Sequence, residues 1–252
     1  MIRLSRERAM AGAAGYRAYA IGDIHGRLDL LEDLLAKIHA ELQRYPSPKT
    51  LLIFVGDLID RGPNSAQVIE RLRTYNRPGI QPVFLLGNHE EVLLRILKGE
   101  AELIAKWRWF GGAECLQSYG VEPEQLVHLS DSEALLVVRR AIPRKHLEFL
   151  ESFVDSCRFG DYLFVHAGIR PGVQLDQQSQ ADLRWIREPF LLDDSDHGFV
   201  VVHGHTICNE VDERSNRIGI DTGAYRTGVL TALGVEGTDR WLLDTRITAP
   251  AS

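Results

Sequence analysis

The sequence has few cysteines and no long apolar segment. Its three cysteines, Cys115, Cys157 and Cys208, are far apart in a chain of 252 residues, and none belongs to a Cys-x-x-Cys pair. This argues against a disulfide scaffold, so we expect reduced thiols in a cytoplasmic protein. Arg17 interrupts the most apolar part of the N-terminal region, and no later window could cross a bilayer. We therefore expect neither a signal peptide nor a membrane segment.

The sequence also lacks a long run of basic residues, which argues against a nucleic-acid-binding face. It contains 29 basic and 35 acidic residues, so its formal net charge is −6. An anionic substrate would therefore need local positive charge, either from arginines or from bound cations.

The composition is that of an ordinary globular protein, with 44% hydrophobic and 25% charged residues. The length suits one large α/β domain or two small ones. Because the sequence has no internal repeat, low-complexity segment or linker, we predict a single domain over residues 16–252. Residues 1–15 are predicted to form a flexible N-terminal tail.

Short apolar runs alternate with helical patterns along the chain. Continuous apolar runs are typical of strands that are covered on both faces, and the helical patterns between them predict βαβ units with parallel strands. Residues 101–155 are predicted to be mostly helical. We therefore predict an α/β fold with central mixed sheets flanked by helices. The expected strands lie within residues 16–23, 50–57, 81–90, 157–168 and 198–205.

Polar side chains with metal-binding atoms follow five of the expected strand positions. In open α/β sheets, ligands bind beyond the carboxyl ends of the strands, so we expect these side chains to share one edge. Each alone has an ordinary explanation, as a turn, a hydrogen-bonded core histidine or a helix start. Their occurrence at five strand ends favours a binding site. The six candidate ligands are Asp23, His25, Asp57, Asn88, His166 and His205.

This donor set suits two divalent cations. It comprises three oxygen donors, three imidazoles and no thiolate, which fits Mn²⁺, Fe or Zn²⁺ better than Ca²⁺ or a thiolate zinc site. A carboxylate can bridge two metals that lie about 3.5 Å apart, as in two-metal hydrolytic sites. The sequence therefore predicts two divalent metal ions, with Mn²⁺ as the expected metal.

The motifs "GDIHG", "GDLIDRG", "GNHE", "VHAG" and "GHT" lie in this order between residues 22 and 206. Together they resemble the signature of the phosphoprotein phosphatase (PPP) family within the calcineurin-like metallophosphoesterases. The resemblance is closest to the compact bacterial and phage-type serine/threonine phosphatases, which have little beyond the catalytic domain.

The resemblance implies a role for each matching residue. Asp23 and His25 would hold the first metal, Asp57 would bridge both, and Asn88, His166 and His205 would hold the second. His89 would be the general acid, Asp60 would orient it, and Arg61 would grip the phosphate. The implied reaction is direct attack by a metal-bridging hydroxide on a phosphate ester.

A second arginine is expected on chemical grounds, because guanidinium groups best meet phosphate oxygens that redistribute charge. The segment "DLRWIREPF" offers Arg184 and Arg187, and Arg187 matches the family's Trp-x-Arg-Glu segment. We therefore choose Arg187. The roles of His203, Arg184 and Tyr225 stay open at this point.

The resemblance favours a serine/threonine protein phosphatase acting on a phosphorylated protein or a small phosphoester. The alternative is a symmetrical bis(5′-nucleosyl)-tetraphosphatase, which hydrolyses diadenosine tetraphosphate. Those relatives typically lack the acid of "DRG" and have Asp after "GNH", whereas Asp60 and Glu90 are both present here. A non-catalytic binding module would be expected to have lost ligands. The sequence leaves open the native metal, the phosphotyrosine preference and the oligomeric state.

Overall fold

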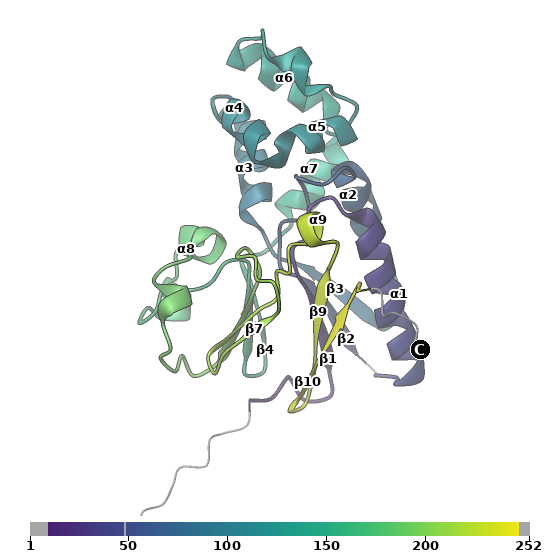
Figure 1. The fold of residues 1–252 in the computed structure, drawn as a ribbon, viewed down its shortest axis with the longest axis vertical. Helices are drawn as coiled ribbons and strands as arrows, with labels where there is room; N and C mark the ends of the chain where they lie inside the picture. Colours follow the sequence, from purple (N-terminus) through teal and green to yellow (C-terminus); the bar gives the residue numbers. More distant parts are fainter. Residues whose placement is uncertain (1–9, 48, 247–252) are drawn as a thin grey trace, which may run out of the picture.

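The computed structural model describes residues 10–47 and 49–246, which form two mixed five-stranded sheets with helices on their outer faces (Figure 1). The first sheet has the order β10-β9-β1-β2-β3. Its central strands β1, β2 and β3 run parallel, and β9 and β10 add an antiparallel edge. The strands are β1 (Arg17–Ile21), β2 (Thr50–Phe54), β3 (Ile80–Phe84), β9 (Thr231–Glu236) and β10 (Asp239–Asp244).

The second sheet has the order β4-β5-β6-β8-β7. β5, β6 and β8 run parallel, while β4 and β7 pair antiparallel at the two edges. Within residues 157–168, where a strand was expected, the chain turns back on itself as part of the antiparallel β4–β5 pair. The strands are β4 (Ser156–Phe159), β5 (Tyr162–Val165), β6 (Val200–His203), β7 (Asp212–Glu213) and β8 (Arg217–Gly219).

The longer helices cover the first sheet or form a helical group beyond its carboxyl end, shown at the top of Figure 1. The α-helices are α1 (Leu28–Arg44), α2 (Ser65–Arg73), α3 (Asn88–Lys98), α4 (Leu103–Trp107), α5 (Ala113–Ser118), α6 (Asp131–Ala141), α7 (Arg144–Glu151), α8 (Gln180–Trp185) and α9 (Ala224–Thr227). Short η segments are η1 (Arg108–Gly112), η2 (Pro123–Leu126), η3 (Leu175–Gln177) and η4 (Phe190–Leu192). The predicted helical character of residues 101–155 and the predicted α/β fold with mixed sheets are thus confirmed.

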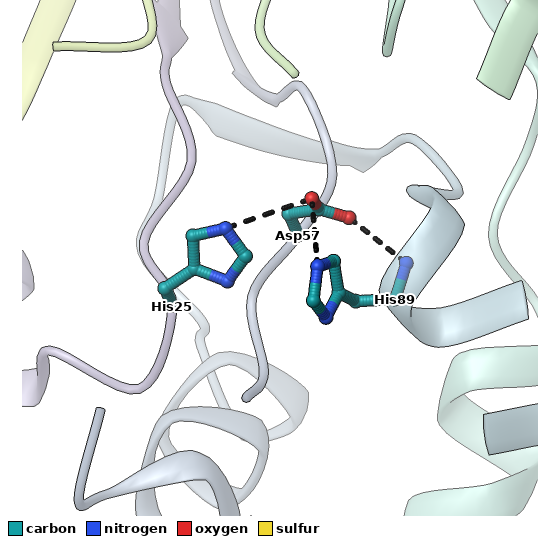
Figure 2. A group of neighbouring side chains, drawn as sticks. All are labelled: His25, Asp57 and His89. Carbon is teal, nitrogen blue, oxygen red and sulfur yellow. Dashed lines mark hydrogen bonds and ion pairs between the residues drawn. The ribbon is translucent and has the colours of Figure 1, made fainter. Parts of the chain in front are cut away.

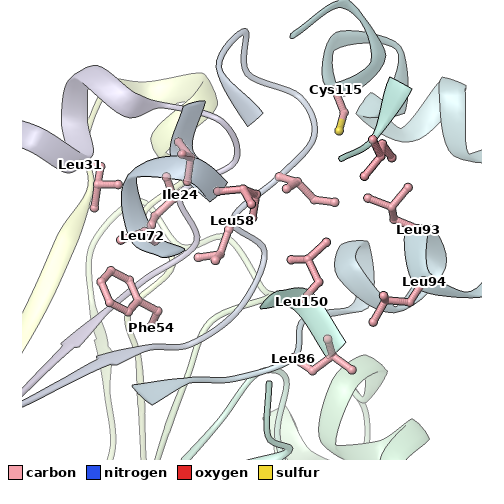
Figure 3. Close-up of a cluster of buried hydrophobic side chains, with 14 of the residues drawn as sticks. Ile24, Leu31, Phe54, Leu58, Leu72, Leu86, Leu93, Leu94, Cys115 and Leu150 are labelled. Atoms are coloured by element: carbon pink, nitrogen blue, oxygen red, sulfur yellow. The ribbon is translucent and has the colours of Figure 1, made fainter. Parts of the chain in front are cut away.

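Side-chain alternation along β1 explains how the first sheet is covered on both faces. Tyr19 and Ile21 belong to the core beneath the helices, whereas Ala18 and Ala20 belong to the core between the two sheets. Successive residues of a strand point to opposite faces, so one strand serves two cores. Figure 3 shows part of the helix-side core, in which residues of the loops that follow β1 and β2 meet α3 and α7. This packing holds the strand ends against the helical group.

The structure describes only the last part of the predicted N-terminal tail. Residues 1–9 lie outside the described residues, but residues 10–15 are held against the core between the two sheets, where Met10 and Ala13 pack. The Gly12 N–H donates to the Gly237 carbonyl at 2.7 Å, and the Asp161 N–H donates to the Ala11 carbonyl at 2.8 Å. The ring of Phe159 leaves no room for a Cβ at Gly12. Backbone pairing to two turns therefore anchors this segment.

Within the described ranges, no helix combines the length and the apolar character needed to span a bilayer.

Candidate metal centre

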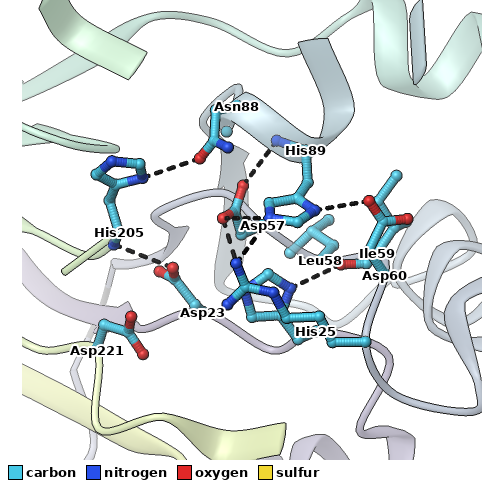
Figure 4. Close-up of polar contacts among 12 residues, drawn as sticks. Asp23, His25, Asp57, Leu58, Ile59, Asp60, Asn88, His89, His205 and Asp221 are labelled. Atoms are coloured by element: carbon cyan, nitrogen blue, oxygen red, sulfur yellow. Dashed lines mark hydrogen bonds and ion pairs between the residues drawn. The ribbon is translucent and has the colours of Figure 1, made fainter. Parts of the chain in front are cut away.

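Five loops that follow strands bring the six predicted ligands to one edge shared by both sheets (Figure 4). The His205 N–H donates to Asp23 Oδ2 at 3.0 Å, and Asn88 Oδ1 lies 2.9 Å from both His166 Nε2 and His205 Nδ1. All of these side chains are buried. Asp23 and His25 follow β1, Asp57 follows β2, Asn88 begins α3 after β3, His166 follows β5, and His205 follows β6.

Asp57 lies at the centre of this group (Figure 2). Its Oδ2 is 3.6 Å from His25 Nε2 and 3.9 Å from His89 Nε2, and its Oδ1 is 3.4 Å from His166 Nε2. In the part of the chain that the structure describes, two sets of ligand atoms, each within 4.8 Å of one another, could hold a metal ion: His25, Asp57 and His89 form one, and Asp57, His166 and His205 form the other. Because both sets contain Asp57, its carboxylate is placed to be shared by two cations.

The backbone of the site is strained. Over residues 10–47 and 49–246, five non-glycine residues adopt positive φ: His25 (45°), Asp57 (49°), Asp60 (71°), Arg61 (66°) and His205 (62°). Such conformations cost of order 1–3 kcal/mol each and persist only where the surroundings impose them. Strain of this kind clusters at functional sites, so its concentration among these residues independently points to function.

Glu90 supplies much of the restraint on the turn after β2. Its carboxylate accepts hydrogen bonds from the backbone N–H groups of Asp57 at 2.9 Å and Leu58 at 2.7 Å. Two glycines then let the carboxylates approach the backbone. A Cβ at Gly87 would clash with Asp57 Oδ1, and a Cβ at Gly204 would clash with Asp23 Oδ1. These glycines are therefore required by close approach.

Backbone carbonyls orient two of the imidazoles. His25 Nδ1 lies 2.8 Å from the Ile59 carbonyl, and His166 Nδ1 lies 2.8 Å from the Val55 carbonyl. Each Nδ1 must carry the proton and donate it, because a carbonyl oxygen only accepts. The Nε2 lone pairs are thereby aimed at Asp57 and its neighbours, as is usual for metal-ligating histidines.

Burial determines the charges of these groups. It lowers the pKa of His166, and it lowers the pKa of His205 to about 3. Burial, reinforced by the charges of Asp221 and Asp57, raises the pKa of Asp23 well above its usual value. The imidazoles are therefore neutral and able to ligate, while the carboxylates crowd one another in a way that a cation would relieve.

Two buried polar atoms without hydrogen-bond partners indicate whether these residues could bind a metal. Among the described residues, the buried atoms Asp23 Oδ1 and His205 Nε2 have no hydrogen-bond partner. Buried polar atoms are rarely left unpaired, and such exceptions call for an explanation, for example a bound ion. A carboxylate oxygen and a neutral imidazole nitrogen are both ligands of borderline divalent cations. The residues present therefore fit divalent metal binding.

His89 and Asp60 form a buried pair beside this centre. His89 Nδ1 lies 2.6 Å from Asp60 Oδ2, and the two side chains are 5% and 0% exposed. Although burial opposes it, the charge of Asp57 and the contact with Asp60 raise the pKa of His89 to about 8. A pKa raised by a paired carboxylate suits a group that delivers a proton.

The structure separates the two candidate arginines. Arg187 lines a cavity beside Asn88 and His205. Arg184 instead forms ion pairs with Asp155 at 2.5 Å and Glu91 at 3.3 Å, which occupy its guanidinium. Arg184 therefore ties α8 to other elements.

The structure also places Tyr225 and His203, whose roles the sequence left open. The Tyr225 ring lies edge-on to His25, with centroids 5.3 Å apart, and the Arg61 guanidinium carbon lies over the Tyr225 ring, 4.8 Å from its centroid. Tyr225 therefore lies against two residues of the site. His203 packs against Phe190, with ring centroids 5.2 Å apart, and burial lowers its pKa to about 4. This packing gives His203 a place in the core.

Two site residues were missed from the sequence. Asp221 is 2% exposed, and burial together with the charge of Asp57 raises its pKa to about 6, even though the Gly223 N–H opposes the shift. Its signal was the "IDTG" segment, a further acid after an apolar run. Trp107 donates from Nε1 to Asp60 Oδ2 at 2.8 Å. No sequence signal distinguished it from a core tryptophan.

A cavity of about 330 Å³ opens beside the centre. One end is formed by the ligand and acid–base residues, and the rest by apolar and cationic side chains from α3, α4, η1 and the end of α8. The lining includes Asp57, Arg61, Asn88, His89, Val92, Arg95, Leu103, Lys106, Trp107, Phe110, Trp185, Arg187 and His205.

Comparison with known proteins links this geometry to a family. A family model described as calcineurin-like phosphoesterase matches residues 16–245. The serine/threonine-protein phosphatase 1 of Salmonella typhimurium is 28% identical over 226 residues, covering 86% of this chain and 91% of that protein. A symmetrical bis(5′-nucleosyl)-tetraphosphatase of Nitrosospira multiformis is 30% identical over 159 residues, or 63% of this chain. The match spans only 46% of that relative's length.

Solved structures agree on the fold. A crystal structure of a candidate diadenosine tetraphosphatase superposes with a TM-score of 0.64 at 22% identity, covering 93% of this chain and 98% of that one. A serine/threonine phosphatase of Saccharomyces cerevisiae superposes with a TM-score of 0.53 at 13% identity, covering 97% of this chain and 86% of that one. At such identities the likeness concerns the fold alone.

Proposed function

The chain belongs to the calcineurin-like phosphoesterase family, and from that premise we propose that it hydrolyses phosphomonoesters of serine and threonine in proteins. The family and the fold expected from the motifs are confirmed, whereas this substrate class is our proposal. Relatives named as protein phosphatase and as dinucleoside tetraphosphatase both match the chain. The choice between them therefore rests on the side chains.

The contact between Asp60 and His89 carries the proposal. A carboxylate held 2.6 Å from Nδ1 orients the ring and raises its affinity for a proton, so that Nε2 can deliver one. A serine or threonine alkoxide is a poor leaving group and needs that proton. A nucleoside polyphosphate is a better leaving group and needs it less. The buried pair therefore suits a phosphomonoester of an alcohol.

We assign the metal ligands as the motifs predict. Asp23 and His25 would hold one divalent cation, Asp57 would be shared, and Asn88, His166 and His205 would hold the other. When bound, such cations supply acidification of a water molecule and Lewis-acid polarisation of a phosphoryl oxygen. The burial, the orientation of the imidazoles and the unpartnered atoms support this assignment.

His89 could instead serve as a ligand, because it lies with His25 and Asp57 in one set of ligand atoms. Its surroundings favour the acid role. Nδ1 is engaged by Asp60, and Nε2 lies 3.1 Å from a nitrogen of the Arg61 guanidinium. A positive guanidinium at this distance disfavours a metal ion on the same nitrogen. Arg61 and Nε2 are instead placed to meet a phosphate together.

Arg187→Ala is expected to weaken phosphoserine hydrolysis by about 10- to 100-fold while leaving the metal content unchanged. The variant loses hydrogen bonds to a charged phosphate, each worth roughly 1.5–3 kcal/mol. Steady-state kinetics and metal analysis by mass spectrometry measure the two quantities. Arg170→Ala is the matched control, since Arg170 is an exposed arginine paired with Asp182. Unchanged kinetics in the Arg187 variant would remove it from the phosphate site.

A second candidate, hydrolysis of diadenosine tetraphosphate, is favoured by the outer wall of the cavity. Phe110 and Trp185 offer exposed aromatic faces that could stack on a base. Arg95 and Lys106 add positive charge that further phosphates could meet. Arg95 is already paired with Glu100 at 2.5 Å, which leaves less of its charge for a further phosphate.

The test is a comparison of rates on a phosphoserine peptide, a phosphotyrosine peptide and diadenosine tetraphosphate with Mn²⁺ present. We expect the highest kcat/KM on phosphoserine, loss of activity after chelation, and recovery when Mn²⁺ is added back. A clear preference for diadenosine tetraphosphate would establish the second candidate instead. Full activity of exhaustively demetallated protein would overturn the metal-dependent mechanism.

A further inference from the structure

One oxygen of Asp60 accepts two hydrogen bonds. His89 Nδ1 lies 2.6 Å from Asp60 Oδ2, and the indole Nε1 of Trp107 donates to the same oxygen at 2.8 Å. Asp60 is fully buried and Trp107 is 2% exposed, so water does not compete freely for this contact. A buried carboxylate needs such donors, because leaving it unpaired costs several kcal/mol.

Trp107 is locked in place by the segment that carries it. The indole lies against Gly112, where a Cβ would clash with the ring. The next residues of the segment hold Asp60's neighbour: the Arg61 N–H donates to the Gly111 carbonyl at 2.9 Å, and a Cβ at Gly111 would clash with Arg61. Residues 103–112 therefore hold the turn that contains Asp60 and Arg61 through two separate hydrogen bonds.

Filling the space at position 107 does not by itself require a side chain with an N–H. A phenylalanine could fill much of the same space, but it has no N–H to meet Asp60. With that donor removed, Oδ2 keeps only His89 as a partner, and the carboxylate can rotate away from the orientation that aligns the ring. The indole N–H thus acts on His89 through Asp60.

We propose that Trp107 is a positioning residue for the Asp60–His89 pair, so that the α4–η1 segment holds the proton donor in its working orientation. Nothing in the family motifs includes this residue. The inference rests on the proposed function for its kinetic consequence. The hydrogen bond itself can be tested without turnover.

The first test uses metal-free protein labelled with ¹⁵N-tryptophan. The chain has four tryptophans, and Trp107→Phe identifies the indole resonance of Trp107 by its loss. Asp60→Asn should shift that resonance and leave the other three nearly unchanged. Those include Trp185 and Trp241, whose indoles donate to Glu91 and Glu41. An unmoved Trp107 resonance would disprove the contact, whatever the substrate of the enzyme.

The second test measures how the loss of activity in Trp107→Phe depends on the leaving group of the substrate. Trp107→Phe should lower kcat on phosphoserine by about 10-fold, the lower end of the range for residues that orient a functional group. It should lower kcat on 4-nitrophenyl phosphate far less, because nitrophenolate leaves without a proton. KM should stay nearly constant, since a lost cavity contact would raise KM instead. Trp109→Phe, two residues away and 90% exposed, is the matched control.

The third test asks whether Trp107 acts through Asp60. In an Asp60→Ala background, Trp107→Phe should cause no further loss on phosphoserine, because the carboxylate through which the indole N–H acts on His89 is gone. Additive losses, or equal losses on both substrates with a lowered melting temperature, would show that Trp107 only supports the fold. If wild-type protein does not hydrolyse phosphoserine, the proposed function fails, and the resonance shift still decides the contact.

Discussion

Asp57→Asn is expected to abolish turnover and to leave the protein without two tightly bound divalent cations. Asp57 belongs to both sets of candidate ligand atoms, and an amide cannot supply negative charge to either ion. The loss should exceed the roughly 10- to 100-fold effect of changing a residue that only orients a ligand. Metal analysis after dialysis and rates on phosphoserine peptide measure both consequences.

Asp57→Asn should leave the fold intact, so that any loss of activity reports on metal binding and catalysis. Asparagine has nearly the shape of aspartate. Its Oδ1 can still accept the hydrogen bond that the backbone N–H of His89 donates at 3.1 Å. Asp33→Asn, on the exposed side of α1, is a matched control that should keep both metals and full activity. Two tightly held ions and a normal rate in Asp57→Asn would show that this carboxylate is not shared.

His89→Asn is expected to slow phosphoserine hydrolysis by about 10²–10⁴-fold, the usual contribution of general acid catalysis. Hydrolysis of 4-nitrophenyl phosphate should slow much less, because its leaving group needs little protonation. Metal content should stay unchanged, since His89 is assigned to the proton and not to a cation. The measurement is kcat on both substrates together with metal stoichiometry.

Neighbouring variants should give different patterns. Asp60→Asn should show the same dependence on the leaving group more mildly, because it orients His89 without replacing it. Asn88→Ala should lose the second metal and slow both substrates alike, since Asn88 Oδ1 is the point where His166 and His205 converge. The assignment of His89 is falsified if its variant slows both substrates equally and also empties a metal site.

The sequence by itself determined the family, the α/β fold and the convergence of the six candidate ligands. The reason is local: an apolar run followed by glycine and a polar residue marks a strand end, and parallel strands deliver their ends to one edge. Asp23, Asp57 and His166 could therefore be grouped without coordinates. The packing of residues 10–15 could not be predicted in this way, because their hydrogen-bond partners are turns far along the chain.

Only the tertiary structure decided which other side chains contact the residues at that edge. Arg184 and Arg187 are three residues apart, and the motif match favours Arg187. Only the structure shows that Asp155 and Glu91 occupy Arg184 from other elements. Trp107 meets Asp60 across 47 residues through the path of α4 and η1, which no local pattern encodes. Sequence periodicity reports how a side chain lies relative to its own helix or strand. Hydrogen bonds between elements depend on how those elements pack, and that is decided by the whole fold.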